Sequence, residues 1–240
     1  MKIKKVLFGK EKKYYWIEGD LHTQHGVIKG DDISTAEEPI KSHMNKEFLV
    51  SEANFKDNTD KLKRGPQAMH SKDIGQIMAN TGINKNSKVI DAGVGSGMNT
   101  CHLANIVKTV YGYERRPEFL KIAEKNIKSL DLKNVKLKDA DIYEGISEKD
   151  VDLISLDLAE PWQVIPHAEK ALKSGGYLVS YSPSTPQVSD FVEAIKTNKN
   201  FKLVKVIETI ERPWKVNGRT IHPEFQILGH TGFLTFVRKI

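Results

Sequence analysis

The pattern of hydrophobic and polar positions changes near residue 60. Before that point, short β-rich runs alternate with turn-prone pairs of glycine with lysine or aspartate, and three runs predict strands over residues 5–8, 14–17 and 26–28. Residues 61–67 lead out of this part, and Gly65-Pro66 interrupts regular structure there. We therefore predict a small β-rich domain over residues 1–60 and a second domain over residues 61–240.

From about residue 71 the pattern alternates between helix and strand. Residues 71–80 place Ile74, Ile77 and Met78 on one face of a helix. Further helices are predicted over residues 96–108 and 117–130, and strands over 88–91, 109–114, 135–137, 151–157 and 177–181. This alternation is typical of βαβ units and a parallel sheet. Two more strands, over 201–211 and 232–238, have no helix between them, so the α/β sheet is predicted to be mostly parallel with an antiparallel C-terminal strand.

The composition is that of a globular protein with a hydrophobic core, since 39% of the 240 residues are hydrophobic and 28% are charged. No apolar run approaches the roughly 20 residues that a membrane span needs. The basic N-terminus is followed by only a short apolar stretch, which argues against a secretory signal. Cys101 is the only cysteine, so we expect no internal disulfide, no cysteine-based zinc site and a cytoplasmic location.

The net charge of +6 favours contact with polyanions. Six of the first thirteen residues are lysine, against the single acidic residue Glu11. Such lysines can form an RNA-binding surface, or they can simply protect the edge of a strand from pairing with another chain. The charge pattern alone does not favour one interpretation over the other.

Residues 89–97 read Val-Ile-Asp-Ala-Gly-Val-Gly-Ser-Gly and join a predicted strand to a predicted helix at the edge where α/β sheets bind ligands. A dinucleotide fingerprint, G-x-G-x-x-G, needs glycine where this chain has Met98. The third glycine is instead Gly97, and the pattern resembles motif I of class I methyltransferases, which bind S-adenosylmethionine. That ligand has no pyrophosphate, and a helix N-terminus favours its carboxylate. The candidate cofactor-binding residues of this loop are Asp91, Gly93, Gly95, Ser96 and Gly97.

Two acidic residues after the following strands complete the candidate cofactor site. Glu114 ends the second predicted strand, where a carboxylate can accept hydrogen bonds from both hydroxyls of a ribose. The alternative for Glu114 is a first-turn acid for the helix at Pro117, but its coupling to the glycine loop favours the ribose role. Asp141 follows the third strand, where class I methyltransferases place a side chain against adenine. An exposed turn residue is the alternative for Asp141, and Asp139 is a nearby competitor.

The fourth predicted strand ends at Asp157, which should face the position of the transferable methyl group. Amino-methylating enzymes of this class keep a polar residue there and often an aromatic one. Trp162 can therefore stack on the substrate, or it can pack against the protein. A helix cap is the alternative role for Asp157.

Strings along residues 60–240 resemble one family in particular, the tRNA (adenine-N1)-methyltransferases. They are Arg64-Gly65-Pro66-Gln67, Lys72-Asp73, the glycine loop, Tyr113-Glu114, Arg116-Pro117-Glu118-Phe119, Asp157-Leu158, Glu160-Pro161-Trp162, Tyr181, Gln187-Val188 and Gly229-His230-Thr231-Gly232-Phe233. The predicted small N-terminal β domain also matches the architecture of this family. The resemblance implies the Rossmann-like fold of class I methyltransferases.

Members of that family transfer methyl from S-adenosylmethionine to N1 of an adenine in the T-loop of tRNA. The target is position 58, and in some archaeal members also position 57. They commonly form homotetramers, or heterotetramers in eukaryotes. The resemblance implies that Asp157 is the catalytic aspartate and that the cofactor contacts Gln67, Gly93, Gly95, Gly97, Glu114 and Asp141. No metal is required, and the small domain becomes a candidate module for tRNA binding or oligomer assembly.

Two positions depart from the family pattern. Ala159 stands where many members have proline, so the loop after Asp157 is expected to be less rigid. His70 stands where relatives often carry tyrosine, and its ring could hold the target base by stacking. For His230, a structural hydrogen bond is the preferred interpretation.

Two alternatives stay open at this point. The first is a class I methyltransferase that acts on a small molecule or on protein carboxylates. The second is a tRNA-binding subunit that has lost catalysis, although the intact glycine loop, Glu114 and Asp157 argue against it. A nicotinamide-dependent enzyme is disfavoured by Met98.

Overall fold

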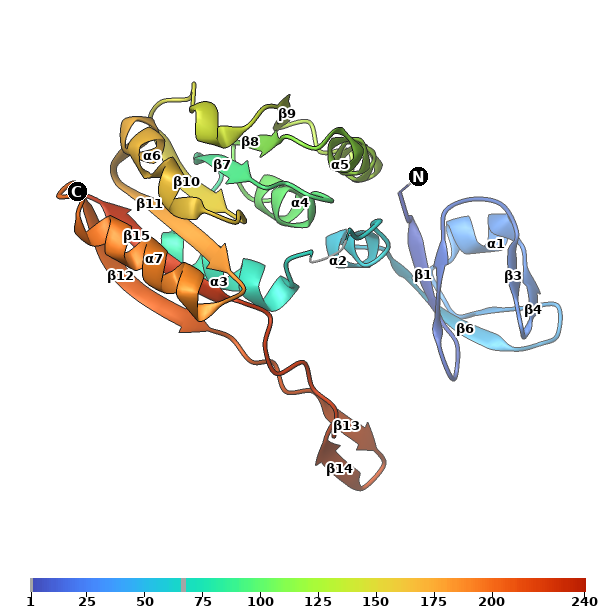
Figure 1. Ribbon diagram of the computed structural model, residues 1–240. Coiled ribbons are helices and arrows are strands. Elements are labelled where there is room, and N and C mark those ends of the chain that lie inside the picture. The colour runs from blue at the N-terminus through green and yellow to red at the C-terminus, as the bar shows by residue number, and fades with distance from the viewer. Residues whose placement is uncertain (1, 66–67) are drawn as a thin grey trace. The chain divides into compact units, whose positions relative to one another are not determined.

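The computed structural model describes residues 2–65 and 68–240. The contacts divide the chain into two compact units (Figure 1). The smaller comprises residues 1–63 with 128–131, and the larger comprises residues 64–127 with 132–240. No helix in the described part of the chain is long and apolar enough to cross a membrane.

The smaller unit is built on an antiparallel sheet in the order β2-β1-β6-β5. The three predicted strands are confirmed as β1, β2 and β4, whereas the other elements of this unit were not predicted. The elements are β1 (Lys5–Phe8), β2 (Lys13–Trp16), β3 (Leu21–Thr23), β4 (Gly26–Ile28), α1 (Gly30–Thr35), β5 (Ile40–Lys41), β6 (Glu47–Glu52) and α2 (Phe55–Thr59). Their shared core consists of Leu7, Trp16, Ile28, Ile33 and Phe48.

The larger unit contains a seven-stranded sheet in the order β12-β15-β11-β10-β7-β8-β9. Its strands are β7 (Lys88–Ala92), β8 (Thr109–Glu114), β9 (Val135–Asp139), β10 (Val151–Leu156), β11 (Leu172–Ser182), β12 (Phe201–Glu208) and β15 (Phe233–Lys239). The five strands from β7 to β11 run parallel to one another, and β15 lies antiparallel between β11 and β12. The predicted mostly parallel sheet with an antiparallel C-terminal strand is confirmed.

Successive residues of a strand point to opposite faces of the sheet. Since both sets of side chains are apolar here, helices cover both faces. Val89 and Leu153 pack with Ile77 of α3 in one cluster. The adjacent Ile90 and Ile154 join Phe191 of α7 in another. The helical elements are α3 (Ser71–Thr81), α4 (Met98–Ala104), α5 (Pro117–Ser129), η1 (Ile142–Glu144), η2 (Pro161–Val164), α6 (Ile165–Ala171) and α7 (Thr185–Lys196).

Several predicted boundaries differ from the structure, and two of these differences have local backbone reasons. The helix predicted from residue 96 begins at Met98, because Gly97 before it takes a left-handed conformation with φ +84°. The predicted strand 201–211 ends at Glu208, and the chain then leaves the sheet as an arm that carries β13 (Trp214–Asn217) and β14 (Thr220–Pro223) (Figure 1). Gly218, with φ +56°, opens the two-residue turn of this hairpin. A glycine in that position was the signal that could have predicted the hairpin.

The loop after β7 lies directly against the end of β10. The Asp157 amide donates to the carbonyl oxygen of Ala92 at 2.9 Å, and the Gly93 amide donates to that of Tyr113 at 3.0 Å. Gly93 has φ +80°, and a β-carbon there would lie 2.1 Å from the Asp157 carbonyl oxygen. Only glycine permits this approach. The loop and the end of β10 are therefore fixed to one another.

Alanine substitutions at Gly93 and Gly95 distinguish the cost of the close contact with Asp157 from the cost of a left-handed backbone conformation alone. Gly95 also has a positive φ, +55°, but a β-carbon there meets nothing closer than 3.8 Å. Gly95→Ala should therefore cost only the left-handed conformation, about 1–2 kcal/mol of unfolding free energy. Gly93→Ala should cost about 1–3 kcal/mol more, because the backbone of the loop or of Asp157 has to move. Urea denaturation of both variants measures the difference, and equal destabilisation would contradict the close contact.

Candidate active site

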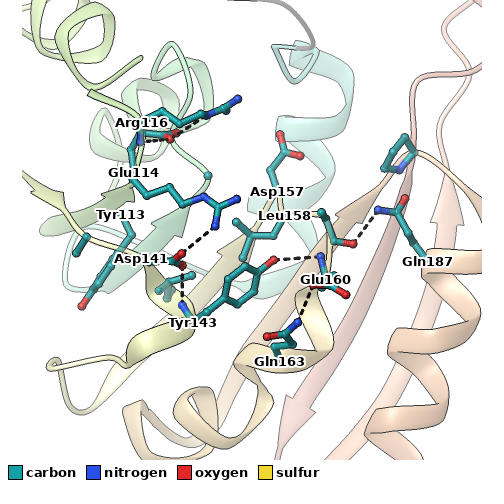
Figure 2. A pocket seen from close by; sticks show the side chains of 16 residues that line it. Tyr113, Glu114, Arg116, Asp141, Tyr143, Asp157, Leu158, Glu160, Gln163 and Gln187 are labelled. Carbon is teal, nitrogen blue, oxygen red and sulfur yellow. Dashed lines mark hydrogen bonds and ion pairs between the residues drawn. The ribbon is translucent and has the colours of Figure 1, made fainter. Parts of the chain in front are cut away.

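Two neighbouring cavities open at the edge of the sheet where the parallel strands end. The larger has a volume of about 510 Å³ and the smaller about 110 Å³. Both are lined by Gly93, Arg116 and Asp157, which therefore mark where they meet. Figure 2 shows the larger cavity, with Asp157 and Leu158 between the β8 side and the α7 side.

The smaller cavity is lined by the glycine loop and by the first residues of α4. Asp91 and Asn99 also line it. The Asp91 carboxylate is 2% exposed and accepts hydrogen bonds from Asn99 Nδ2 at 2.8 Å and from the Thr100 hydroxyl. Burial raises the pKa of Asp91 to about 6, although both hydrogen bonds act to lower it. Asp91 thus ties α4 to the end of β7.

Asn99 leaves one polar atom unsatisfied at this cavity. Its Nδ2 donates to Asp91 and to the Ser155 hydroxyl, at 3.0 Å. Its Oδ1 is buried and has no hydrogen-bond partner among the described residues. A buried carbonyl oxygen without a donor is unfavourable, so the smaller cavity suits a ligand that donates a hydrogen bond.

Glu114 lies at the end of β8 and lines the larger cavity. Its side chain is buried, with Oε2 accepting from the Gly95 amide at 2.8 Å and Oε1 accepting from the Arg116 amide at 3.0 Å. Arg116 Nε lies 3.3 Å from the same Oε1. Each carboxylate oxygen has two lone pairs, so Glu114 can hold the glycine loop and still accept from a ligand in the larger cavity. The ribose role of Glu114 stays a prediction, and its bond to the Arg116 amide also fits the alternative of an acid at the start of the helix at Pro117.

Asp141 lies in the larger cavity at the start of η1. Oδ1 accepts from the Tyr143 amide at 3.0 Å, and Oδ2 forms an ion pair with Arg115 at 2.9 Å (Figure 2). The hydrogen bond and charge of Asp141 raise the pKa of Arg115. Its competitor Asp139 lines neither cavity. Tyr143 faces the same cavity, and its hydroxyl accepts from the Glu160 amide at 3.1 Å.

Asp157 differs from these acids because no described residue donates a hydrogen bond to its carboxylate. It is partly buried at the meeting point of the two cavities. The pKa of Asp157 is raised to about 7, mainly by burial and then by the charges of Asp91 and Glu114, while Arg116 opposes the shift. Asp157 is therefore a polar acceptor that is available to a ligand.

The loop after Asp157 is held by α7. Gln187 Nε2 donates to the Ala159 carbonyl oxygen at 3.0 Å, and Gln187 Oε1 accepts from the Ser184 hydroxyl at 2.9 Å. These bonds restrain a loop that was expected to be less rigid because Ala159 replaces proline. Gln187, like Arg115, Arg116 and Tyr143, was not predicted as a site residue.

Three predicted residues are not brought into the described site. Trp162 in η2 packs against the core and lines neither cavity. His70 is exposed at the start of α3 and also lines neither. Gln67 lies outside the described residues. The roles assigned to these three residues stay predictions. Ser96, in contrast, lines the smaller cavity with Gly93 and Gly95. A fourth predicted residue, Gly97, is the N-cap of α4 and lines neither cavity, so its cofactor role also stays a prediction.

Comparison with known proteins places this site in a family. The family described as the tRNA methyltransferase complex GCD14 subunit matches residues 58–223. The tRNA (adenine(57)-N(1)/adenine(58)-N(1))-methyltransferase TrmI of Methanocaldococcus jannaschii is 36% identical, and the alignment covers 98% of this chain and 94% of the relative. TrmI of Thermus thermophilus, a tRNA (adenine(58)-N(1))-methyltransferase, is 33% identical over 83% of this chain and 80% of its own.

Solved structures are similar over nearly the whole chain. A SAM-dependent O-methyltransferase of Thermotoga maritima has a TM-score of 0.86 and 30% identity, covering 99% of this chain and 93% of its own. The tRNA (m1A58) methyltransferase TrmI of Aquifex aeolicus has a TM-score of 0.82 and 27% identity, and the match covers 99% of this chain and 96% of its own. The predicted class I methyltransferase fold is confirmed by these similarities. The chain belongs to the tRNA methyltransferase family of the GCD14 subunit.

Proposed function

We propose that this enzyme transfers a methyl group from S-adenosylmethionine to N1 of an adenine in the T-loop of tRNA. The target that we propose is position 58, with position 57 as a second candidate because the Methanocaldococcus relative is named for both. The observation that carries the proposal is the Asp157 carboxylate where the two cavities meet, to which no described residue donates a hydrogen bond, in a chain of this family.

The residues present fit S-adenosylmethionine. Gly93 lines both cavities without a side chain, so the loop backbone can approach a ligand, and Asn99 Oδ1, which has no donor among the described residues, can accept from the ammonium group of the methionine part. Glu114 can accept from the ribose hydroxyls, and Asp141 lies beside the space for the adenine. Three acids near the junction, Asp91, Glu114 and Asp157, also favour a cationic ligand.

When bound, S-adenosylmethionine would supply a methyl group activated by its sulfonium sulfur. The N1 lone pair of adenine would attack the methyl carbon, and the electrons of the carbon–sulfur bond would stay on the sulfur. Asp157 can accept a hydrogen bond from the exocyclic amine of that adenine, which fixes the base and stabilises the positive charge that develops on it. The enzyme then acts mainly by alignment, which can supply several kcal/mol. A T-loop adenine must leave its stack to reach Asp157, at a cost of a few kcal/mol.

Basic and aromatic side chains of the smaller unit support its role as an RNA-binding module. Lys12 lies 5.0 Å from the ring centroid of Tyr14, and Lys13 and Lys61 lie 5.0 and 4.6 Å from that of Tyr15. Lysines contact phosphates, and aromatic rings can stack on unpaired bases. This arrangement favours the RNA surface over mere protection of a strand edge.

The arm supports assembly into a homo-oligomer, for which the family resemblance suggests a tetramer. Cross-strand pairing places Trp214, Val216, Ile221 and Pro223 on one face of the β13–β14 hairpin and polar residues on the other. On the apolar face, Trp214, Val216 and Ile221 are 58%, 68% and 60% exposed. An isolated two-stranded hairpin is marginally stable in water, so a second copy of the chain is proposed to cover this face.

The cytoplasmic location is part of the same proposal. Cys101 is unpaired and buried, and burial raises the pKa of its thiol to about 12. A buried thiol of this kind is unreactive, and the protein needs no oxidising compartment for it.

The direct test is incubation of an unmodified tRNA transcript with the purified protein and labelled S-adenosylmethionine, followed by mapping of the modified base. We expect 1-methyladenine at position 58. Transcripts in which adenine 58 or adenine 57 is replaced by guanine distinguish the two positions. Label on another nucleotide, or transfer to a small molecule or a protein carboxylate only, would overturn the proposal.

Asp157→Asn should lower the single-turnover rate of methyl transfer by about 10²–10³-fold, because the neutral amide stabilises the developing charge less well. Its affinity for S-adenosylmethionine, measured by calorimetry, should stay nearly unchanged. Asp139→Asn is the matched control at the same edge of the sheet and should behave as the wild type. Near-normal turnover of Asp157→Asn would remove this residue from the mechanism.

The single-turnover rate should rise with pH through about 7, since the carboxylate form of Asp157 is the active one and its pKa lies there. The rate of Asp157→Asn, although low, should not show this rise. Rates measured with saturating cofactor between pH 5.5 and pH 8 test the prediction. A wild-type rate that is flat across this range contradicts it.

Trp214→Glu should dissociate the oligomer, because it places a charge on the apolar face of the arm. Lys215→Glu changes the neighbouring residue on the polar face, and its oligomer should remain intact. Sedimentation velocity compares the two variants with the wild type. If both variants sediment as the wild type does, the arm is not the subunit contact.

A further inference from the structure

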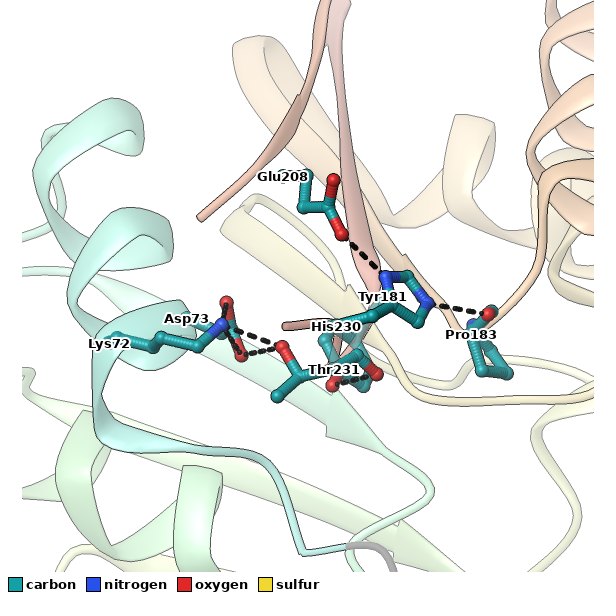
Figure 3. A network of polar contacts seen from close by, with 7 residues as sticks. All are labelled: Lys72, Asp73, Tyr181, Pro183, Glu208, His230 and Thr231. Atoms are coloured by element: carbon teal, nitrogen blue, oxygen red, sulfur yellow. Dashed lines mark hydrogen bonds and ion pairs between the residues drawn. The ribbon is translucent and has the colours of Figure 1, made fainter. Parts of the chain in front are cut away.

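His230 joins three parts of the larger unit at the base of the arm (Figure 3). Its Nδ1 lies 2.5 Å from Oε1 of Glu208, where β12 ends and the arm begins. Its Nε2 lies 2.9 Å from the carbonyl oxygen of Pro183, which follows β11 and lines the larger cavity. A carboxylate and a carbonyl only accept hydrogen bonds, so both bonds can form together only when the ring is an imidazolium.

Thr231 and Gly232, which follow His230, fix the position of this segment. The Thr231 hydroxyl donates to Asp73 Oδ2 at 2.9 Å and accepts from Lys72 at 2.6 Å, within a buried Lys72–Asp73 ion pair. The Thr231 carbonyl oxygen accepts from the Tyr181 hydroxyl at 2.8 Å. A β-carbon on Gly232 would lie 2.6 Å from the Tyr181 ring. The position of His230 is therefore set by α3 and β11 as well as by its own bonds.

A continuous set of contacts leads from His230 to the loop that carries Asp157. Pro183 precedes Ser184, whose hydroxyl donates to Gln187. Gln187 in turn donates to the carbonyl oxygen of Ala159, two residues after Asp157. Pro183, Gln187 and Ala159 all line the larger cavity. A shift of the Pro183 carbonyl would therefore move the wall of the cavity next to Asp157.

We propose that His230 is a positioning residue for methyl transfer, whose two hydrogen bonds hold the 183–187 segment against the Asp157 loop. This inference rests on the proposed function. The bridge needs the protonated ring. The charged groups that act on this ring are Glu208 from β12 and Lys72 from α3, and β11 contributes only the Pro183 carbonyl.

The pH dependence follows from the two partners. The hydrogen bond to Glu208, and then that to Pro183, raise the pKa of His230 above its ordinary value, while Lys72 acts in the opposite direction. The bridge is present below this raised pKa and is lost as the pH rises through it. Activity should therefore rise as Asp157 ionises and decline at higher pH as His230 loses its proton.

His230→Gln and Glu208→Gln test the bridge, with His222→Gln as the matched control. A glutamine at position 230 has one donor group that can reach only one partner at a time. His222 lies on the arm and contacts the carbonyl of Pro223 and the ring of Phe225, outside the bridge. The assays are kcat and KM for the tRNA transcript between pH 6 and pH 9, the dissociation constant of S-adenosylmethionine, and an NMR titration of ¹³C-labelled histidine rings.

We expect His230→Gln to lower kcat about tenfold at pH 6.5, the scale on which misplaced groups slow a reaction, and to remove the alkaline decline. Its affinity for S-adenosylmethionine should equal that of the wild type, which also shows that the variant is folded. Glu208→Gln should move the decline to lower pH, because the ring loses a charged partner. His222→Gln should match the wild type in every assay. The NMR signal absent from His230→Gln should titrate above the ordinary histidine range.

Three outcomes overturn the inference or its basis. If His230→Gln keeps the wild-type kcat and pH profile, His230 does not position the site. If the His230 signal titrates at or below the ordinary range, the imidazolium bridge does not exist. If the wild type fails to methylate tRNA, the proposed function falls, and the NMR titration, which needs no substrate, still decides separately whether the bridge forms.

Discussion

The site depends on the contact between the glycine loop after β7 and the backbone at the end of β10. Gly93 approaches the Asp157 carbonyl so closely that any side chain is excluded, and the Asp157 amide is bonded to Ala92. This contact brings two neighbouring strand ends together and leaves the Asp157 side chain between the two cavities. In the proposed reaction, the methyl donor at the loop and the acceptor base at Asp157 would therefore be aligned by the same backbone contact.

Electrostatics follow from that geometry. Asp91, Glu114 and Asp157 converge near the junction of the cavities, and only Arg116 opposes their charge on Asp157. Asp91 and Glu114 use their oxygens to hold α4 and the glycine loop. Asp157 has no such partner among the described residues, so its carboxylate is the least stabilised of the three. A cationic ligand relieves this repulsion, which suits both a sulfonium donor and the charged base that the reaction leaves.

Local patterns in the sequence predicted most of the fold. The alternation of helices and strands predicted β7 to β11 along the chain. The spacing of the glycines distinguished a methyltransferase loop from a dinucleotide-binding loop. Glu114, Asp141 and Asp157 were predicted because each follows a strand, and parallel strand ends meet at one edge. The residues that were missed act through long-range contacts. Gln187 reaches Ala159, and Thr231 reaches Asp73, across sequence separations that no local pattern records.

The hairpin of the arm was missed for a different reason. Trp214 and Val216 follow the alternation of apolar and polar residues that is typical of a strand. Such an alternation usually indicates a strand with one face on the core, whereas the apolar side chains of this hairpin are exposed. Trp162 shows the converse case. Its position in a family string left substrate stacking and core packing both open, because a sequence does not state which side of a short helix faces the cavity, and its ring packs against the core.

Ala159 shows how one local departure can be balanced by distant contacts. A proline would restrict the loop after Asp157 through its own ring, whatever the rest of the protein does. Here the restraint is a hydrogen bond from Gln187, which depends on where α7 begins and hence on the 183–187 segment. His230 bonds to Pro183 and to Glu208 at the end of β12, so this restraint also depends on hydrogen bonds that can be broken. Movement of the arm, which begins after Glu208, can therefore be transmitted through Pro183 and Gln187 to the loop that carries Asp157.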